Sequence, residues 1–379
     1  MQHEKGLMIY SDEEAYAAIQ ELFSYPSLLQ GMRAFLPDAL SDLILREKDR
    51  VHSVRDFQEK IARPICKAVE KESIAQLTTR GTEHLDPSNR YLFISNHRDI
   101  ILDSAFLNVA LFEGGFETSQ IAIGDNLMRH RISELIFRIN KSFVVKRSGT
   151  PMELYRYSVQ LSDYIRRQIY EKTDSVWIAQ REGRAKDGDD RTQTGLLKML
   201  SLSAAGDLKD HFKSLHIVPV AISYEYDPCD LLKAQEFLNK RADPAYKKAF
   251  EEDVQHMLLG LKGHKGNVNI HFCPPLDKAL DVFDAEQGAK KQLELLAALI
   301  DQRIHLQYQL HPVNFVAHDL LTQTATFADR YTAEEHKRLS AFFENKSQKL
   351  HGDHEGLGRA YLLRMYANPV LNYQSSLAS

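Results

Sequence analysis

The sequence predicts an α/β protein with a largely parallel β-sheet flanked by helices, an N-terminal helical subdomain and a helical C-terminal extension. Two observations predict this class. After residue 90, short runs of β-branched and aromatic residues alternate with longer helical stretches. Residues 12–80 and the part beyond Leu276 have helical patterns alone. At 379 residues, the chain exceeds what one compact core usually organises. We therefore expect a helical subdomain at 1–80, an α/β core at 81–280 and a helical extension at 281–379.

Composition and charge are those of a globular protein. Apolar residues make up 43% and charged residues 26% of the chain, which excludes a largely disordered or fibrous protein. The 48 basic and 52 acidic residues give a formal charge of −4. No global positive field therefore favours nucleic acid, and we expect no nucleic-acid partner. Cys66, Cys229 and Cys273 lie far apart, which indicates a reducing compartment rather than a disulfide framework.

The sequence has no obvious membrane span. No stretch approaches the roughly 18 to 20 apolar residues of a spanning helix. The best candidate, residues 100–112, is short and contains Asp103, Ser104 and Asn108. The N-terminus has acidic residues where a signal peptide has its apolar core. We therefore expect a cytoplasmic protein that meets a membrane only from its surface.

Residues 12–80 carry apolar residues at three- and four-residue spacing, which is typical of amphipathic helices. In the later part of this region, one apolar stripe with charged residues between its members consists of Phe57, Ile61, Ile65 and Val69. We favour a helical subdomain packed on the core. The alternative is a helix lying on a membrane surface.

The central region has six runs with the composition of strands, at residues 91–95, 120–123, 142–145, 175–179, 217–223 and 268–272. They are nearly continuously apolar and separated by helical stretches, which indicates a mainly parallel sheet buried on both faces. Pro219 cannot donate a ladder hydrogen bond, so it predicts an edge strand or a bulge near a site. Residues 153–171 carry one apolar and one charged face and predict a helix.

The first candidate site group follows the predicted strand at 91–95, and strand ends are where α/β folds bind ligands. It consists of His97, Asp99 and Asp103. A histidine held by a carboxylate through one ring nitrogen can accept a proton through the other. If a helix begins near Asp99, both carboxylates point back toward His97. Alternatively, Asp99 is a helix N-cap and His97 is a packed turn residue.

The second group is Lys146 and Arg147, which leave a predicted strand. They belong to residues 126–150, where six basic residues accompany one acid, Glu134. Such a local excess favours an anionic ligand. A solvated basic surface is the alternative.

The third group follows the predicted strand at 175–179 and contains Glu182, Gly183, Arg184 and Lys186. Gly183 allows close approach to the backbone. Guanidinium groups beside it suit a phosphate, which they can bind with two hydrogen bonds. A charged loop between strand and helix is the alternative.

Taken in order, four sequence blocks resemble the glycerol-3-phosphate and lysophospholipid acyltransferase superfamily: NHRDIILD, FVVKR, REGRAKDG and IVPVAISYE. The resemblance covers residues 85–325, with further matches at VNIHFCPPL and PVNFVAHDLL. Two details depart from the family pattern. Five residues, rather than four, separate His97 from Asp103, and Arg184 follows Gly183 directly. These departures bear on which acceptor is used and on which aspartate orients His97. They do not change the predicted class of enzyme.

The resemblance implies transfer of a fatty acyl group from an acyl carrier protein or coenzyme A thioester. The acceptor would be a hydroxyl of glycerol-3-phosphate or 1-acyl-glycerol-3-phosphate, in phospholipid biosynthesis. His97 would be the general base, oriented by Asp103 or alternatively by Asp99. The acceptor phosphate would be bound by residues from Lys146, Arg147, Glu182, Gly183, Arg184 and Lys186.

The same resemblance implies no metal and no cofactor besides the acyl thioester, which is already activated. A donor to the thioester oxyanion is also required, with backbone amides near Gly183 or Pro219 as candidates. An enzyme that handles two-chain lipids must dock on a membrane, here its cytoplasmic face. The apolar stripes of residues 12–70 or the basic segment 126–147 could form that surface.

Two alternatives remain. One keeps the chemistry but changes the acceptor to a non-phosphate hydroxylated or aminoacyl lipid. The other is a non-catalytic lipid- or carrier-binding protein with the same fold. The presence of His97, both aspartates and Arg184 favours an enzyme.

Overall fold

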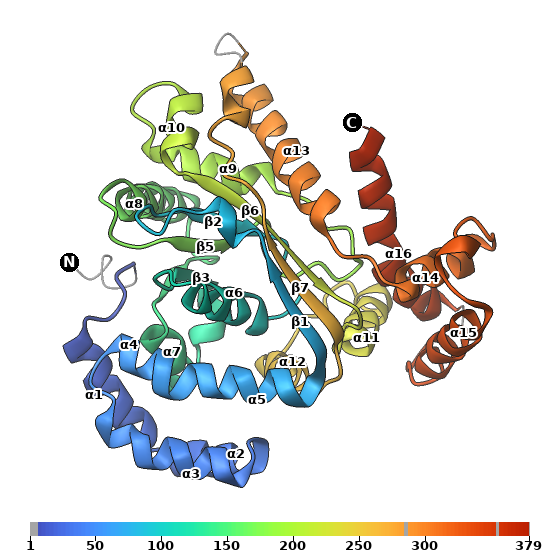
Figure 1. Ribbon diagram of the computed structural model, residues 1–379, viewed down its shortest axis with the longest axis horizontal. Coiled ribbons are helices and arrows are strands. Elements are labelled where there is room, and N and C mark those ends of the chain that lie inside the picture. The colour runs from blue at the N-terminus through green and yellow to red at the C-terminus, as the bar shows by residue number, and fades with distance from the viewer. Residues whose placement is uncertain (1–6, 284–286, 354–355, 379) are drawn as a thin grey trace.

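The computed structural model describes residues 7–283, 287–353 and 356–378 (Figure 1). Its centre is a seven-stranded sheet with the order β1-β7-β6-β2-β5-β3-β4. The strands are β1 (Ile74–Arg80), β2 (Leu92–Ser95), β3 (Gln120–Gly124), β4 (Ser142–Val145), β5 (Val176–Ala179), β6 (Ile217–Tyr224) and β7 (Gly266–Phe272). Only the pairing of β6 with β7 is antiparallel among the described strands. The predicted α/β class with a largely parallel sheet is confirmed.

Helices precede, flank and follow the sheet. The first group is α1 (Asp12–Phe23), α2 (Pro26–Phe35), α3 (Asp38–Glu47), α4 (Val54–Phe57) and α5 (Arg63–Ser73), with a π-helical turn, Gln58–Ala62, joining α4 to α5. The core contributes α6 (Leu102–Glu113), α7 (Arg131–Ile139), α8 (Pro151–Tyr170), α9 (Thr194–Leu200), α10 (Leu208–Ser214), α11 (Asp230–Ala242) and α12 (Phe250–Lys262). The C-terminal group is α13 (Ala289–Gln307), α14 (Pro312–Thr322), α15 (Ala333–Ser347) and α16 (Leu357–Ala378). Within the described ranges, none of these helices is long and apolar enough to span a bilayer.

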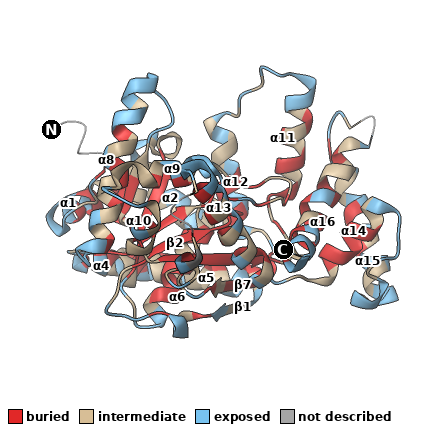
Figure 2. Cartoon of the chain, turned by 90° about the horizontal axis from the view of Figure 1, so that it is seen from above, coloured by how far each residue is buried: buried red, intermediate tan, exposed pale blue. Residues whose placement is uncertain are grey.

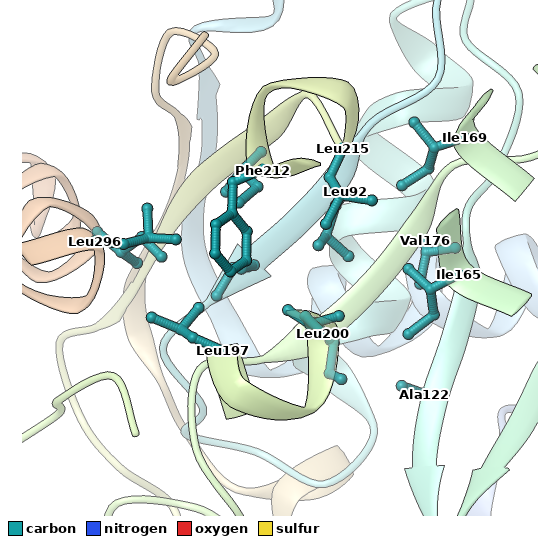
Figure 3. Packing of buried hydrophobic residues seen from close by; sticks show 14 of the residues in the cluster. Leu92, Ala122, Ile165, Ile169, Val176, Leu197, Leu200, Phe212, Leu215 and Leu296 are labelled. Atoms are coloured by element: carbon teal, nitrogen blue, oxygen red, sulfur yellow. The ribbon is translucent and has the colours of Figure 1, made fainter. Parts of the chain in front are cut away.

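The strands alternate their side chains between two apolar layers. Leu92 and Ile94 of β2 belong to a cluster with α8, α9, α10 and α13, part of which Figure 3 shows. Phe93, between them in sequence, belongs to the opposite cluster with α5 and α6. This alternation follows from the two-residue period of a strand. Helices therefore cover both faces of the sheet, which is why its central strands are nearly all apolar.

Helix α8 shows how local sequence sets the elements. The Thr150 hydroxyl accepts from the Glu153 amide, the Glu153 carboxylate accepts from the Thr150 amide, and Pro151 occupies the first helical position. The helix covers residues 151–170, close to the predicted 153–171. Its buried face carries Tyr157, Leu161, Ile165 and Ile169, as the sequence pattern predicts.

Residues 74–80 were expected to be helical, and this prediction is wrong. They form β1, which pairs in parallel with β7 at the edge of the sheet. The strand is half-exposed and contains Gln76, Thr78 and Thr79, so it lacks the continuous apolar run of the central strands.

The expectation that Pro219 marks an edge strand is also wrong. It lies in β6, between β7 and β2. Val220 pairs with Phe272, the last residue of β7, so Pro219 lies just beyond the ladder with β7, while on the other side it pairs with Ile94 of β2. There the Cys273 amide donates to the Pro219 carbonyl at 2.9 Å, and the proline nitrogen is not required as a donor.

The C-terminal helices pack on the core rather than forming a separate layer. Helix α13 lies against β6, and α16 contacts α11, α13, α14 and α15. Figure 2 shows buried residues concentrated in the sheet and the helices next to it, whereas the loop joining α11 to α12 is exposed.

Candidate active site

Four neighbouring parallel strands, β2, β5, β3 and β4, end at one edge of the sheet. The segments that follow them line a cleft of about 290 Å³. It contains five of the predicted site residues, His97, Arg147, Gly183, Arg184 and Lys186. The carboxyl ends of parallel strands are where α/β sheets place their ligands.

His97 lies in the turn between β2 and α6, and its side chain is 15% exposed. Its Nδ1 lies 2.8 Å from Asp103 Oδ2. The ring also packs edge-on against Trp177, with 5.8 Å between ring centroids. When Nδ1–H donates to the carboxylate, the lone pair of the neutral ring lies on Nε2. This arrangement can accept a proton at Nε2.

Asp103 is 1% exposed and is fixed by several donors. Its Oδ2 also accepts the backbone amides of Arg98 and Asp99, at 2.6 and 3.0 Å. The Tyr224 hydroxyl donates to Oδ1 at 3.0 Å. These bonds hold the carboxylate in the plane where it can orient the His97 ring.

Asp99 has a different place. Its Oδ1 accepts the amides of Ile101 and Leu102, so it satisfies free N–H groups at the start of α6. The helix begins at Leu102, so the condition that it begins near Asp99 is not met, and Asp99 instead lies before its first turn. Burial and the negative charge of Asp103 raise the pKa of Asp99. Asp99 thus shapes the turn that carries His97.

The turn at Asp99 depends on a glycine in α12. A Cβ at Gly260 would lie 2.2 Å from Asp99 Oδ2. We expect Gly260→Ala to lower the free energy of unfolding by about 1–3 kcal/mol, because Asp99 is buried and held by two amides. Gly31→Ala in α2 is the matched control, since nothing lies within 4 Å of its Cβ position. Equal stability of the two variants in chemical denaturation would contradict this packing.

A buried ion network lies behind His97. Arg98 is 4% exposed, with Nη1 3.6 Å from Asp190 and Nη2 3.8 Å from Asp227. Lys233 of α11 is fully buried, pairs with Asp227 and donates to the Arg98 carbonyl at 3.0 Å. The backbone directly after His97 is therefore held by the core.

Arg184 is buried, and its Nη1 lies 3.2 Å from Nδ1 of His256 in α12. Burial and the positive charge of Arg184 lower the pKa of His256 to about 2. The imidazole is therefore neutral and accepts from the guanidinium without cancelling its charge. Lys186 pairs with Glu236 of α11, which also pairs with Lys240 at 2.7 Å.

Two predicted phosphate-binding residues do not line the cleft. The Lys146 ammonium lies over the Tyr157 ring, 4.7 Å from its centroid. Glu182 is exposed and lies 3.5 Å from Arg147, so it partly neutralises that cation. Of the group, the structure brings Arg147, Gly183, Arg184 and Lys186 together.

The basic segment 126–147 is not a free basic surface. Arg131 pairs with Glu21 and Glu134, and Lys141 pairs with Asp174. Arg129 faces the cleft. The local excess of positive charge is thus divided between the cleft and internal contacts.

A second, largely apolar cavity of about 350 Å³ adjoins the cleft. Ile100 lines both, and it follows His97 by three residues. The cavity walls come from α1, α2, α4, the π-helical turn, α5, α6, α7, α12, β3 and the start of β4. They include the predicted stripe Phe57, Ile61, Ile65 and Val69, which therefore faces inward. The stripe therefore packs on the core, which is the interpretation that we favoured over a helix lying on a membrane surface.

Sequence reasoning missed several residues of this site. Lys248, Phe250 and Asp253 reach the cleft from the loop and helix after α11, where the sequence has no recognisable motif. Arg129 was seen only as part of a basic cluster. Tyr224 is the last residue of β6, the strand that contains Pro219. Its position at a strand end was the only sequence signal that could have marked it as a site residue.

Comparison with known proteins gives one family match. Residues 76–223 match the model described as Acyltransferase. Among solved structures, the chain is similar to the 1-acyl-sn-glycerophosphate (LPA) acyltransferase PlsC from Thermotoga maritima, with 13% identity and a TM-score of 0.34, over 75% of this chain and 91% of that chain. Comparison with the curated proteins yields no match. The family match contains the turn of His97 and the cations at 147, 184 and 186. Residues 76–223, which form most of the α/β core, thus match the acyltransferase family, in agreement with the resemblance of the sequence motifs.

Proposed function

We propose that the protein transfers a fatty acyl group from an acyl thioester to a hydroxyl of glycerol-3-phosphate or 1-acyl-glycerol-3-phosphate, in phospholipid biosynthesis. The donor is acyl carrier protein or coenzyme A. The observation that carries the proposal is the meeting of an apolar cavity and a cationic cleft at Ile100, beside His97. An acyl chain suits the cavity, a phosphate suits the cleft, and the ester bond forms between them.

The cleft offers the charge that an acceptor phosphate needs. Arg147, Arg184 and Lys186 line it beside His97. A phosphate monoester carries about −1.5 to −2 charge at pH 7, and guanidinium groups can bind it with two parallel hydrogen bonds. Binding the phosphate brings the acceptor hydroxyl near the base and converts a bimolecular encounter into an oriented one.

In the proposed reaction, His97 Nε2 takes the proton from the acceptor hydroxyl as its oxygen attacks the thioester carbonyl carbon. The tetrahedral intermediate then breaks its carbon–sulfur bond. The sulfur leaves with the proton from the imidazolium, so the products are an ester and a thiol. Asp103 keeps the Nδ1–H tautomer and stabilises the imidazolium.

The oxyanion of the intermediate requires a hydrogen-bond donor. Gly183 lines the cleft with a left-handed backbone, φ 71°, which turns the chain toward the ligand. Its backbone amide region is the proposed donor. Pro219, the other candidate, lies within β6 and is not part of the cleft lining.

The cavity assignment predicts a change in chain-length preference. Ala105 of α6 lines the apolar cavity and is half-buried. We expect Ala105→Phe to lower kcat/KM for a palmitoyl thioester more than tenfold, because excluding two methylene groups costs about 1.6 kcal/mol.

A butyryl thioester serves as the internal control for Ala105→Phe, since a short chain needs little of the cavity. Its kcat/KM should stay within about twofold of wild type. If both donors lose activity equally while the thermal unfolding midpoint is unchanged, the cavity is not the acyl site.

We also propose that the enzyme acts peripherally at the cytoplasmic face of a membrane, because a two-chain product is released into a bilayer. Helix α2 supports this place of contact: none of its residues is buried, and Leu28 and Met32 line the apolar cavity. The protein should co-sediment with vesicles of anionic phospholipid. Equal recovery in the supernatant with and without vesicles would contradict membrane docking.

A further inference from the structure

The cleft has a wall that does not come from the strand ends. Helices α11 and α12 are inserted between β6 and β7. Glu236, Lys248, Phe250 and Asp253 from this hairpin line the cleft. The Phe250 ring packs on His130, with 4.1 Å between centroids, and so joins the hairpin to the segment after β3. Figure 2 shows the hairpin rising from the core with an exposed connecting loop.

The hairpin also orients the two cations that follow β5. His256 accepts from Arg184, and Glu236 pairs with Lys186. The positive charge of Arg184 is not neutralised by this contact, because His256 is an uncharged partner. The cleft as a whole carries five basic residues, with Glu236 and Asp253 as its carboxylates, and the basic set is Arg129, Arg147, Arg184, Lys186 and Lys248. A dianion would offset two of the three excess positive charges.

Lys248 is the hairpin's own cation in the cleft. Its side chain is 15% exposed, and its Nζ lies 2.6 Å from Asp253. Burial lowers the pKa of Lys248, the bond to Asp253 opposes this, and the charge of Arg184 lowers it further. Lys248 and Arg184 both line the cleft, so one half-buried site holds two cations. An anion between them would relieve this repulsion.

Asp253 has a second source of stabilisation. It lies in the first turn of α12, where the helix dipole favours a negative charge. Lys248 can therefore turn from Asp253 to a ligand without leaving that carboxylate unsupported. This makes the lysine available to a bound anion.

We propose that Lys248 is a specificity-determining residue that binds the acceptor's phosphate monoester together with Arg184. The inserted α11–α12 hairpin then selects for a phosphate-bearing acceptor, in addition to the cations at the strand ends. The inference rests on the proposed acyl transfer for the identity of the acceptor. The binding of a phosphate group at Lys248 can be tested without turnover.

The test compares Lys248→Met with Lys247→Met. Lys247 is adjacent in sequence, exposed and outside the cleft lining, so it is a matched control for charge and composition. Steady-state kinetics with glycerol-3-phosphate should show an acceptor KM raised about ten- to a hundredfold in Lys248→Met, the range for one charge-assisted hydrogen bond. The kcat and the thioester KM should stay unchanged, and Lys247→Met should behave as wild type.

Binding of inorganic phosphate, measured by calorimetry without a thioester, separates this inference from the proposed function. Suppose that Lys248→Met binds phosphate more weakly but the wild type does not turn over glycerol-3-phosphate. The phosphate site at Lys248 would then stand, and glycerol-3-phosphate would be rejected as the acceptor. Unchanged acceptor KM and phosphate affinity would overturn the inference. A rise in the thioester KM alone would do so too, because it would assign the lysine to a donor phosphate.

Asp253→Asn provides a second variant. If Lys248 binds phosphate, removing the competing carboxylate should lower the acceptor KM about two- to tenfold. If the pair only stabilises the hairpin, the variant should lower the thermal unfolding midpoint and leave the acceptor KM unchanged, which would overturn the inference.

Discussion

Replacing His97 with asparagine should lower kcat for acyl transfer by roughly 10² to 10⁴, the usual contribution of a positioned general base. Asparagine can still donate to Asp103 but cannot take up the proton of the acceptor hydroxyl. The acceptor KM should change little, because the proposed phosphate contacts, Arg147, Arg184 and Lys186, are separate from the base. Steady-state kinetics with a long-chain acyl thioester measures both constants.

The chain contains a second histidine–aspartate pair that serves as the control. His216 Nδ1 lies 2.6 Å from Asp277, outside the cleft lining. His216 has φ 43°, a left-handed conformation that asparagine tolerates well. His216→Asn should keep wild-type kcat. If His97→Asn and His216→Asn have the same kcat, His97 is not the base.

Lys233→Met should be the most destabilising single substitution described here, with a loss of about 3–5 kcal/mol in the free energy of unfolding. Lys233 is fully buried and pairs with Asp227, which is 4% exposed. Burial favours the neutral form of Asp227, but the charges of Lys233 and Arg98 outweigh it and hold its pKa at about 2. Without the lysine, a buried carboxylate loses its nearest counter-charge. Urea denaturation monitored by circular dichroism measures the loss.

Lys240→Met is the control on the same helix. Lys240 is about half exposed, and its buried partner Glu236 keeps its pairing with Lys186 when Lys240 is replaced. The loss should therefore stay near the range of exposed ion pairs, about 0–1 kcal/mol. Equal losses for Lys233→Met and Lys240→Met would contradict the role of the buried pair.

The Asp227 pair also predicts a pH dependence. A carboxyl whose pKa is lower in the folded than in the unfolded chain contributes its full stabilisation above its ordinary value of 3.8. The contribution is lost as the pH falls toward about 2. The stability difference between wild type and Lys233→Met should therefore shrink in this acidic range.

The central fold was predictable because its strands are buried on both faces. Continuous apolar runs such as 91–95 and 217–223 indicate strands whose two faces are both buried. Strand β1 was not predictable for the same physical reason: at the sheet edge it exposes Gln76 and Thr79, and its sequence lacks the apolar run. Pro219 misled because a proline is tolerated inside a sheet where the neighbouring strand ends.

The strand-end part of the site was also predictable. His97, Arg147 and Arg184 each follow a strand of a parallel sheet, and such ends converge at one edge. The residues contributed by the hairpin were not, because Lys248 lines the cleft and His256 contacts Arg184 only through the packing of the hairpin against the core. A basic residue in the loop of an inserted hairpin has no local pattern that separates a ligand contact from a solvated surface.

The C-terminal helices illustrate the same limit. The Tyr366 hydroxyl and Lys346 both bind the buried Asp230, at the start of α11. Asn368 of α16 donates to the Asp187 carbonyl, just after Lys186. The C-terminal helices therefore stabilise the loop after β5 and the α11–α12 hairpin, both of which line the cleft. Helical periodicity predicted their existence but not the element on which they pack.

The most direct test of the proposed reaction is acyl transfer from a palmitoyl thioester, with glycerol-3-phosphate and its 1-acyl derivative offered side by side. We expect an ester product with at least one of the two, and its loss in His97→Asn. An ester product with neither acceptor, under conditions where the thioester is intact and the protein folded, would contradict the assignment of the cationic cleft to a glycerophosphate.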